Sequence, residues 1–325
     1  MTDNPPPSRP GERDLETEWN AIIKQLEDFG INIAQWLTGL GIGEDADLRT
    51  ITLAEPISRA RRPAVRLEMT IGRASIRALP TGSKSLIEAN VTSIGPVEMS
   101  ATTSGEEKAV RLRQKRFTAP TAANDLFKPV KDAVDTVARI DELNWDIKLS
   151  PDVPLNLTVS AGLTIDNFDF TGLNLAKLSM DGGTGHCVVK MPAGVANAAI
   201  EGSVGVFDMM IPDGAKLTLA MDNGAGSTNI FIGHATVKAE IEGGVGACKI
   251  YVPHDAAVRL RADSGLGNIV VPERLKEVEF ESEFISESGR WETPGFEFAP
   301  NKIDIRYEGG VGSLTIEHKA LTNTE

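Results

Sequence analysis

The chain has 325 residues, of which 41% are apolar and 24% are charged, the composition of a soluble globular protein. Aromatic residues make up only 5% while glycine reaches 31 residues, a bias that favours an aliphatic core with many tight turns over a helical bundle. The net charge of −13 argues against nucleic acid as the main partner, because an acidic surface repels phosphate backbones.

The first 45 residues predict a tail followed by one helix. Residues 1–13, rich in proline and charge, are expected to be disordered. Residues 14–45 predict an amphipathic heptad helix that ends in the glycines of "GLGIG". Its seam could form a short coiled coil with a protein partner or a second copy, a lid over the β core, or a helix on a membrane surface. The seam residues are Leu15, Trp19, Ile22, Leu26, Phe29, Ile33, Trp36 and Leu40.

Neither a secretory signal nor a transmembrane helix is expected. The N-terminus has no cationic start followed by an apolar stretch, and the longest apolar-looking run, residues 31–43, is interrupted by polar side chains and too short to span a bilayer. We therefore expect a cytoplasmic protein without an integral membrane segment, with peripheral membrane association left open. Cys187 and Cys248 suit buried free thiols better than a disulfide framework.

Residues 46–120 predict an N-terminal β region with short alternating strands, and 121–145 predict a helical bridge that leads out of it. The arginines of the β region are expected to lie on a solvated strand face, with a binding patch as the alternative. Glu68 and Gly72 repeat an acid-to-glycine spacing that recurs later in the chain, which suggests that this region is a diverged relative of the repeats.

Residues 146–319 carry the strongest signal, an internal repeat built on a short turn motif. The first five copies are 20 or 21 residues apart, and the jump of 45 residues to the sixth leaves room for a degenerate copy around Gly289. The sequence predicts a mainly β, solenoid-like stacked-repeat domain, followed by a tail at 320–325. The turns are "DGGTG", "EGSVG", "DNGAG", "EGGVG", "DSGLG" and "EGGVG", which end at Gly185, Gly205, Gly226, Gly246, Gly267 and Gly312.

The phase of the apolar pattern changes at each turn. Before the last glycine the apolar residues fall at odd distances, such as Leu219 and Met221, whereas after it they fall at even distances, such as Cys248 and Ile250. Both halves have the period of a strand, but a straight strand would turn its apolar face outward after the turn. The chain must therefore bend or bulge at every turn, where glycine accepts positive φ.

Six acids stand four residues before the last glycines, and stacking of the repeats would align them in a column. Mutual repulsion requires compensation by water, by hydrogen bonds to turn amides, or by a hard cation such as calcium. Turn capping is the simpler interpretation, because the period differs from that of calcium-binding β-roll repeats. We expect no cofactor, with calcium as the alternative. The acids are Asp181, Glu201, Asp222, Glu242, Asp263 and Glu308.

Other candidate sites are weaker. The glycine turns lead into strands rather than a helix N-terminus, which argues against a phosphate loop. His234 and His254 occupy the same repeat position and could meet as a metal pair, with two exposed loop histidines as the alternative. No nucleophile motif occurs, so we expect no enzymatic activity.

Several motifs in order carry a family resemblance. "WDIKL" at 145–149, "VPLNL" at 153–157, the acid-Gly-Gly-x-Gly turns and the closing "NKIDIRYEGGVGSLTIEH" resemble the toast-rack β domains of the LiaF-like, cell-wall-active antibiotics response family. The resemblance implies a non-catalytic bacterial β domain that senses envelope stress at the membrane through partner proteins. Members commonly carry N-terminal membrane helices, whereas this chain has the heptad helix.

These observations favour a non-enzymatic scaffold or regulatory interaction protein, linked to envelope stress through the resemblance. The alternative is an adhesin-like or carbohydrate-binding β domain, stabilised by a cation. A β-helix enzyme acting on polysaccharides is disfavoured, because the sequence shows no cluster of acids and bases on one outer face.

Overall fold

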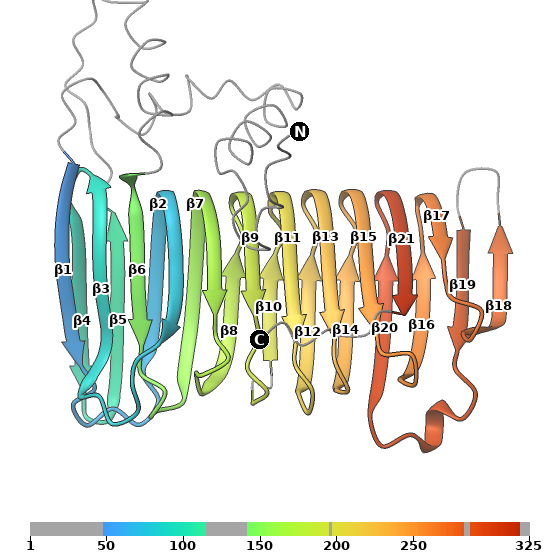
Figure 1. The fold of residues 1–325 in the computed structure, drawn as a ribbon, viewed down its shortest axis with the longest axis horizontal. Coiled ribbons are helices and arrows are strands. Elements are labelled where there is room, and N and C mark those ends of the chain that lie inside the picture. Colours follow the sequence, from blue (N-terminus) through green and yellow to red (C-terminus); the bar gives the residue numbers. More distant parts are fainter. Residues whose placement is uncertain (1–47, 115–141, 195–196, 283–286, 319–325) are drawn as a thin grey trace, which may run out of the picture.

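The computed structural model describes residues 48–114, 142–194, 197–282 and 287–318 (Figure 1). The predicted tails 1–13 and 320–325, the helix 14–45 and residues 121–141 of the predicted bridge lie outside the described residues. The described part is almost entirely β, which confirms the predicted fold class.

The first part of the fold contains seven strands. They are β1 (Leu48–Pro56), β2 (Ala64–Ala78), β3 (Ser85–Ile94), β4 (Val97–Ser104), β5 (Glu107–Gln114), β6 (Asn144–Leu149) and β7 (Leu155–Asp169). The predicted helical bridge is wrong at its last residues, because Asn144 and Trp145 open β6. The strand has an alternating pattern, and the fully buried Trp145 donates its indole N–H to the carbonyl of Ile71 at 3.2 Å.

The second part repeats one unit, a coil of two strands. The strands are β8 (Leu175–Asp181), β9 (Thr184–Lys190), β10 (Asn197–Glu201), β11 (Val204–Ile211), β12 (Lys216–Asp222), β13 (Ala225–Ile232), β14 (Thr236–Glu242), β15 (Val245–Val252), β16 (Ala257–Asp263) and β17 (Leu266–Val270). The chain ends with β18 (Lys276–Ser282), β19 (Glu287–Glu292), the 3₁₀ helix η2 (Phe296–Phe298), β20 (Lys302–Glu308) and β21 (Val311–His318).

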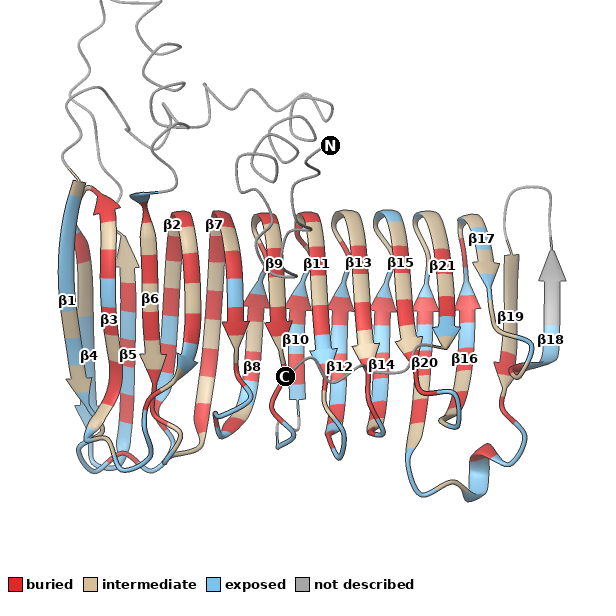
Figure 2. Cartoon of the chain, in the orientation of Figure 1, coloured by how far each residue is buried: buried red, intermediate tan, exposed pale blue. Residues whose placement is uncertain are grey.

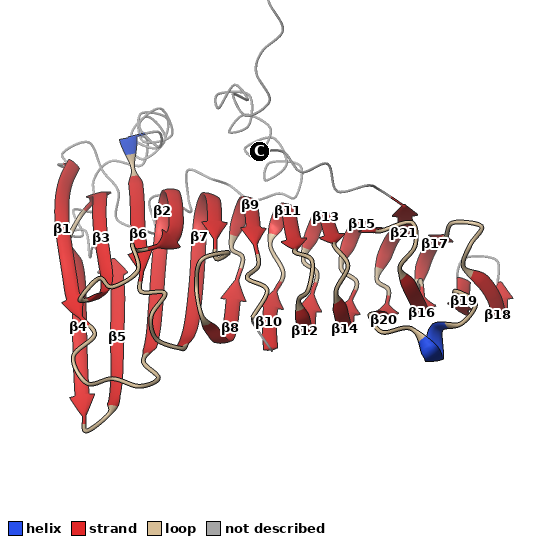
Figure 3. Ribbon diagram, turned by 60° about the horizontal axis from the view of Figure 1, so that its bottom comes forward, coloured by secondary structure: helices blue, strands red, loops and turns tan. Residues whose placement is uncertain are grey.

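Two layers of strands face each other along the molecule (Figures 1 and 3). Layer A runs β4, β5, β2, β7, β8, β10, β12, β14, β20, β16, β19, β18. Layer B runs β1, β3, β6, β2, β7, β9, β11, β13, β15, β21, β17. The long strands β2 and β7 contribute to both layers, one half to each.

A single aliphatic core fills the space between the layers, from Val65 to Ile316, and passes through both predicted β regions. Buried and exposed residues alternate along coil strands such as β12 and β14 (Figure 2). β2 and β7 each form a complete coil as one continuous strand. Their register places Glu68 beside Ser160, and Ser160 beside Asp181. The N-terminal β region is thus a diverged part of the same stack, as Glu68 and Gly72 predicted.

Each coil from β8 onward bends at a two-residue corner between its layer A strand and its layer B strand, which confirms the predicted bend. Gly312 follows such a corner with φ +147°, and a Cβ placed on it would lie 1.7 Å from the carbonyl oxygen of Gly246 in the next coil. Only glycine permits both the positive φ and the close stacking of these backbones. The phase change seen in the sequence follows from this corner.

The order of the coils departs from the sequence order. β20 lies between β14 and β16, and β21 lies between β15 and β17, so that the sixth repeat is inserted between the fourth and the fifth. Tyr307 of β20 thereby sits in the core beside Ile241 and the small Ala262, with its hydroxyl against Gly243. Simple stacking in chain order is therefore wrong for the last coil.

The residues around Gly289 do not form a degenerate parallel repeat. β18 and β19 form an antiparallel hairpin, and β19 pairs antiparallel with β16, which places Gly289 opposite Ala262. A Cβ on Gly289 would lie 2.7 Å from the ring of Trp291, which is buried at this end of the core. The ring of Trp291, which covers this end of the core, therefore leaves no room for a side chain at position 289.

Candidate functional site

The corners of successive coils line up along one side of the molecule, and we call this line the corner ridge. Its layer A side carries the six predicted acids, each at the end of its strand. Strand register places each acid beside the next, in the order Asp181, Glu201, Asp222, Glu242, Glu308 and Asp263. Neighbouring strands are about 4.8 Å apart, so the predicted acid column exists with its last two members exchanged.

All six acids are exposed, which lets water reduce their mutual repulsion. Asp181 and Asp263 also cap their own corners, because they accept backbone N–H bonds from Gly183 at 3.4 Å and Gly265 at 3.1 Å. Glu308 forms an ion pair with Arg306. Within the described residues no group of three His, Cys, Asp or Glu side chains has the geometry of a metal site. The calcium alternative stays a prediction.

The layer B side of the corner ridge is apolar at one end, a feature that the sequence analysis missed. Val245, Val311 and Leu266 follow their corners directly, lie side by side in register, and are 53%, 49% and 47% exposed. We call these three the aliphatic row. The sequence contains a signal for this row at position x of the motif acid-Gly-Gly-x-Gly. That position is Val, Val and Leu in these three coils, whereas the first coil has Thr184. Contiguous exposed aliphatic side chains are typical of interaction surfaces.

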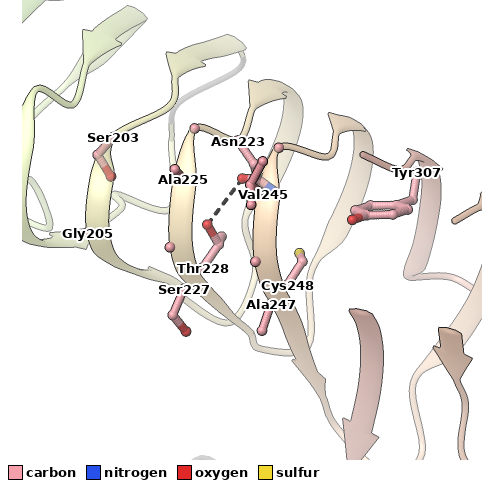
Figure 4. A pocket seen from close by; sticks show the side chains of 14 residues that line it. Ser203, Gly205, Asn223, Ala225, Ser227, Thr228, Val245, Ala247, Cys248 and Tyr307 are labelled. Carbon is pink, nitrogen blue, oxygen red and sulfur yellow. Dashed lines mark hydrogen bonds between the residues drawn. The ribbon is translucent and has the colours of Figure 1, made fainter. Parts of the chain in front are cut away.

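A small pocket beneath the corners is lined by the corner glycines and by a few polar side chains, among them Ser203, Asn223 and Thr228 (Figure 4). Thr228 donates a hydrogen bond to Asn223 at 3.2 Å, and Cys248 and Tyr307 lie in the neighbouring coils. Burial raises the pKa of the Cys248 thiol to about 12, and burial also raises the pKa of Tyr307 to about 12. Both groups stay protonated at neutral pH, so neither supplies an activated nucleophile.

Both cysteines are buried free thiols, as predicted. Cys187 lies beside Asp166 of β7, a carboxyl that is buried in the core. Asp166 accepts a hydrogen bond from Thr164 at 2.8 Å, and its second oxygen has no partner in the described part of the chain. Burial raises the pKa of Asp166 to about 8, so the carboxyl is mostly protonated at neutral pH.

The proposed pair of His234 and His254 does not form. His234 lies 2.9 Å from Asp255 and 3.6 Å from Asp213, and the hydrogen bond with Asp255 raises its pKa. His254 instead packs against His318, with ring centroids 5.0 Å apart. The two histidines occupy the same repeat position on neighbouring coils, as the sequence indicates. His234, however, contacts Asp213 and Asp255 of the adjacent loops.

A family model, described as the N-terminal domain of toast_rack, DUF2154, matches residues 44–212. The chain belongs to the toast-rack family. This match spans the N-terminal β region and the first coils, and the toast-rack coil continues beyond it in β12 to β17, β20 and β21. The family expected from the sequence motifs is thereby confirmed at the level of the toast-rack domain.

Two of the solved structures that match this chain show low similarity to it. The "putative cell adhesion protein" of Clostridium sporogenes ATCC 15579 has 16% identity and a TM-score of 0.40, and covers 84% of this toast-rack chain and 100% of its own. The "putative adhesin" of Bacteroides fragilis NCTC 9343 has 10% identity and a TM-score of 0.33, and covers 82% of this chain and 97% of its own. A search of curated proteins gave no match.

In the described part of this toast-rack chain, no helix is long and apolar enough to cross a membrane.

Proposed function

We propose that this toast-rack protein is a non-enzymatic scaffold that binds a protein partner along the corner ridge. The observation that supports the proposal is the aliphatic row beside the acid column. Val245, Val311 and Leu266 are about half exposed, and Glu242, Glu308 and Asp263 end the preceding strands of the same three coils. Such a surface fits a segment that is apolar on one face and rich in lysine and arginine on the other.

The two sides of the ridge contribute differently to such binding. Covering an aliphatic side chain removes apolar area from water at roughly 25 cal/mol per Å², which supplies affinity. The acids are exposed and solvated, so they contribute mainly to the association rate and to the choice of partner. A basic partner would be attracted to the ridge at low salt, whereas an acidic amphipathic segment would be repelled.

The proposal is tested with a labelled basic amphipathic peptide in fluorescence anisotropy, beside an acidic peptide of the same apolar pattern. The variant Val245→Thr, Val311→Thr, Leu266→Thr keeps β-forming residues and removes the aliphatic row. We expect it to weaken binding of the basic peptide by about tenfold or more. The control Val270→Thr, Val278→Thr changes valines that are 47% and 50% exposed outside the row. Equal affinity of the triple variant and the wild type contradicts the proposal.

Two further hypotheses belong to the same proposal. The resemblance to LiaF-like proteins suggests that the partner belongs to an envelope stress response. The heptad seam 14–45 is a second partner site predicted from sequence alone, and comparing partner capture by the full chain and a chain without residues 1–45 separates it from the corner ridge. The adhesin-like and carbohydrate-binding alternative stays a prediction.

A further inference from the structure

Three arginines lie side by side at the far end of layer A. Register pairs Arg306 of β20 with Arg261 of β16, and Arg261 with Arg290 of β19. We call them the arginine row. Like charges directly opposite each other on neighbouring strands destabilise a sheet. The coil itself does not require arginine here, because the same position holds Ser179, Ala199, Ala220 and Glu240 in the preceding coils, and Glu240 lies beside Arg306.

The charges of the arginine row are incompletely neutralised. Arg306 pairs with Glu308, and Arg290 lies 3.6 Å from Glu292, which already binds Arg259 at 2.8 Å. Arg261 forms no ion pair with a described residue, and the buried Nε of Arg290 has no hydrogen-bond partner there. Glu279 of β18 also lies opposite Arg290 in register, so the unused guanidinium donors are those of Arg261 and the Nε of Arg290. Guanidinium donors favour carboxylates as ligands.

The arginine row lines an open groove of about 1000 Å³ on the outer face of layer A. β16, β19 and β20 form its floor, and Glu279 of β18 and Ser288 of β19 contribute to its lining. Asp263 and Glu308 lie at its corner end, so the groove suits a ligand with a few carboxylates in a row better than a dense polyanion.

The middle of the acid column has the complementary arrangement. Glu201, Asp222 and Glu242 are exposed, lie side by side in register, and form no ion pair with a described residue. Both rows run across strands, so both have the same spacing of about 4.8 Å. The acids stand on a convex ridge, whereas the arginines line a groove.

We propose that the arginine row of one copy binds the acid column of a second copy. The inference rests on the proposed function, because it names a second copy as the partner of the acidic side of the corner ridge. The groove lies at the end of the stack and the column lies along its side, so the contact is heterologous and oligomers can grow by adding copies. Each added copy presents a new groove and a new column.

Sedimentation velocity of the full-length chain tests the inference. At 0.15 M salt the Debye length of about 8 Å screens repulsion between whole molecules, while contact pairs persist; at about 1 M salt the pairs are screened as well. We expect the average mass to rise with concentration at 0.15 M salt and to fall back at 1 M. The single variants Arg261→Glu and Asp222→Lys should each weaken association by about tenfold or more.

A mixture of the two variants provides the decisive comparison. The groove of the Arg261→Glu copy then meets the column of the Asp222→Lys copy, and the unchanged groove meets the unchanged column, so association should return to the wild-type level. A control variant, Arg66→Glu, changes an arginine at the other end of the stack that pairs with Glu68 and should leave the mass unchanged. Circular dichroism melting checks that every variant is folded.

Three outcomes contradict the inference. The wild-type chain stays monomeric, the mixture does not restore association, or Arg261→Glu loses association while Asp222→Lys keeps it. If an acidic peptide fills the groove while the chain stays monomeric, the occupant is another protein and the second copy is excluded. Binding of the basic amphipathic peptide by a monomeric chain would overturn this inference and leave the proposed function intact.

Discussion

The two ends of the stack differ in how the last strands of their layers are paired. A parallel sheet that stops leaves a strand edge with unpaired backbone groups, which invites association with other chains. At the N-terminal end, both layers finish in antiparallel pairings: on layer A, β5 pairs parallel with β2 and then antiparallel with β4, and on layer B, β3 pairs antiparallel with β6 and with β1. At the other end only layer A receives antiparallel strands, β19 and β18, and layer B stops at β17.

Side chains replace the missing strand at β17. Glu287 accepts the backbone N–H of Ile269 at 2.7 Å, and Ser264 donates its hydroxyl to the carbonyl of Gly267 at 3.0 Å. These bonds satisfy two backbone groups of β17 without a partner strand. The ends also differ in charge: Arg66 and Arg111 at the N-terminal end both pair with Glu68, whereas Arg261 in the arginine row forms no ion pair with a described residue. The proposed contact with a second copy uses the end at which layer B stops at β17.

The largest expected loss of stability follows from replacing a corner glycine, and each end of the stack has one. Gly72→Ala and Gly312→Ala should each lower the free energy of unfolding by about 5 kcal/mol or more. The φ values are +115° and +147°, and a Cβ would lie 2.6 Å from the carbonyl oxygen of Leu143 or 1.7 Å from that of Gly246. Gly82→Ala is the control, at about 1 kcal/mol, because no atom lies within 4 Å of its Cβ. Urea unfolding measures all three, and equal losses would refute the corner argument.

Asp166, a buried carboxyl in β7 near the N-terminal end of the stack, should make the stability of the protein depend on pH. Its pKa rises from 3.8 to about 8 on folding, so the folded state binds the proton more tightly. This contribution to stability is complete below pH 4 and is lost as the pH rises to about 8, by roughly 3–5 kcal/mol. Asp166→Asn mimics the protonated carboxyl and should flatten the decline. Melting curves from pH 5 to pH 8 that fall equally in both proteins would exclude this role.

The capped edge of β17 predicts a smaller effect. Glu287→Ala removes the acceptor of the Ile269 N–H and should cost about 1–2 kcal/mol, while Glu287→Gln keeps an oxygen in place and should cost less. The alanine variant should also associate more strongly through the exposed edge, and salt should not reverse this association. An alanine variant that matches the glutamine variant in both stability and mass would show that the cap is dispensable.

The smallest effect is expected for the arginines at the N-terminal end. Glu68→Gln breaks its ion pairs with Arg111 at 2.7 Å and Arg66 at 2.6 Å. The hydrogen bond from Arg111 is the main cause that lowers the pKa of Glu68, so its contribution is present at neutral pH and lost as the pH falls through that value. Since the arginines are about half exposed, the change should be at most about 1 kcal/mol. A loss of unfolding free energy that is larger than this and independent of salt would contradict the view that these ion pairs contribute little to stability.

The regular coils were the most predictable part of this fold. The period of 20–21 residues indicates stacking, and the change from odd to even apolar positions around Gly226 or Gly246 requires a corner. These inferences hold because a strand has period two and glycine alone accepts the corner backbone. The acid column follows from the same register. Its turn caps at Asp181 and Asp263 were the simpler interpretation and are present.

Tertiary structure alone decided the order of the coils and the surfaces that depend on it. "EGGVG" at 242–246 and at 308–312 is the same motif, and nothing local shows that the second is inserted before the fifth coil. That insertion brings Val245, Val311 and Leu266 together, and with the antiparallel β19 it aligns Arg306, Arg261 and Arg290. The sequence determined the coil, because its corner and core are local; packing between distant coils determined which side chains became neighbours.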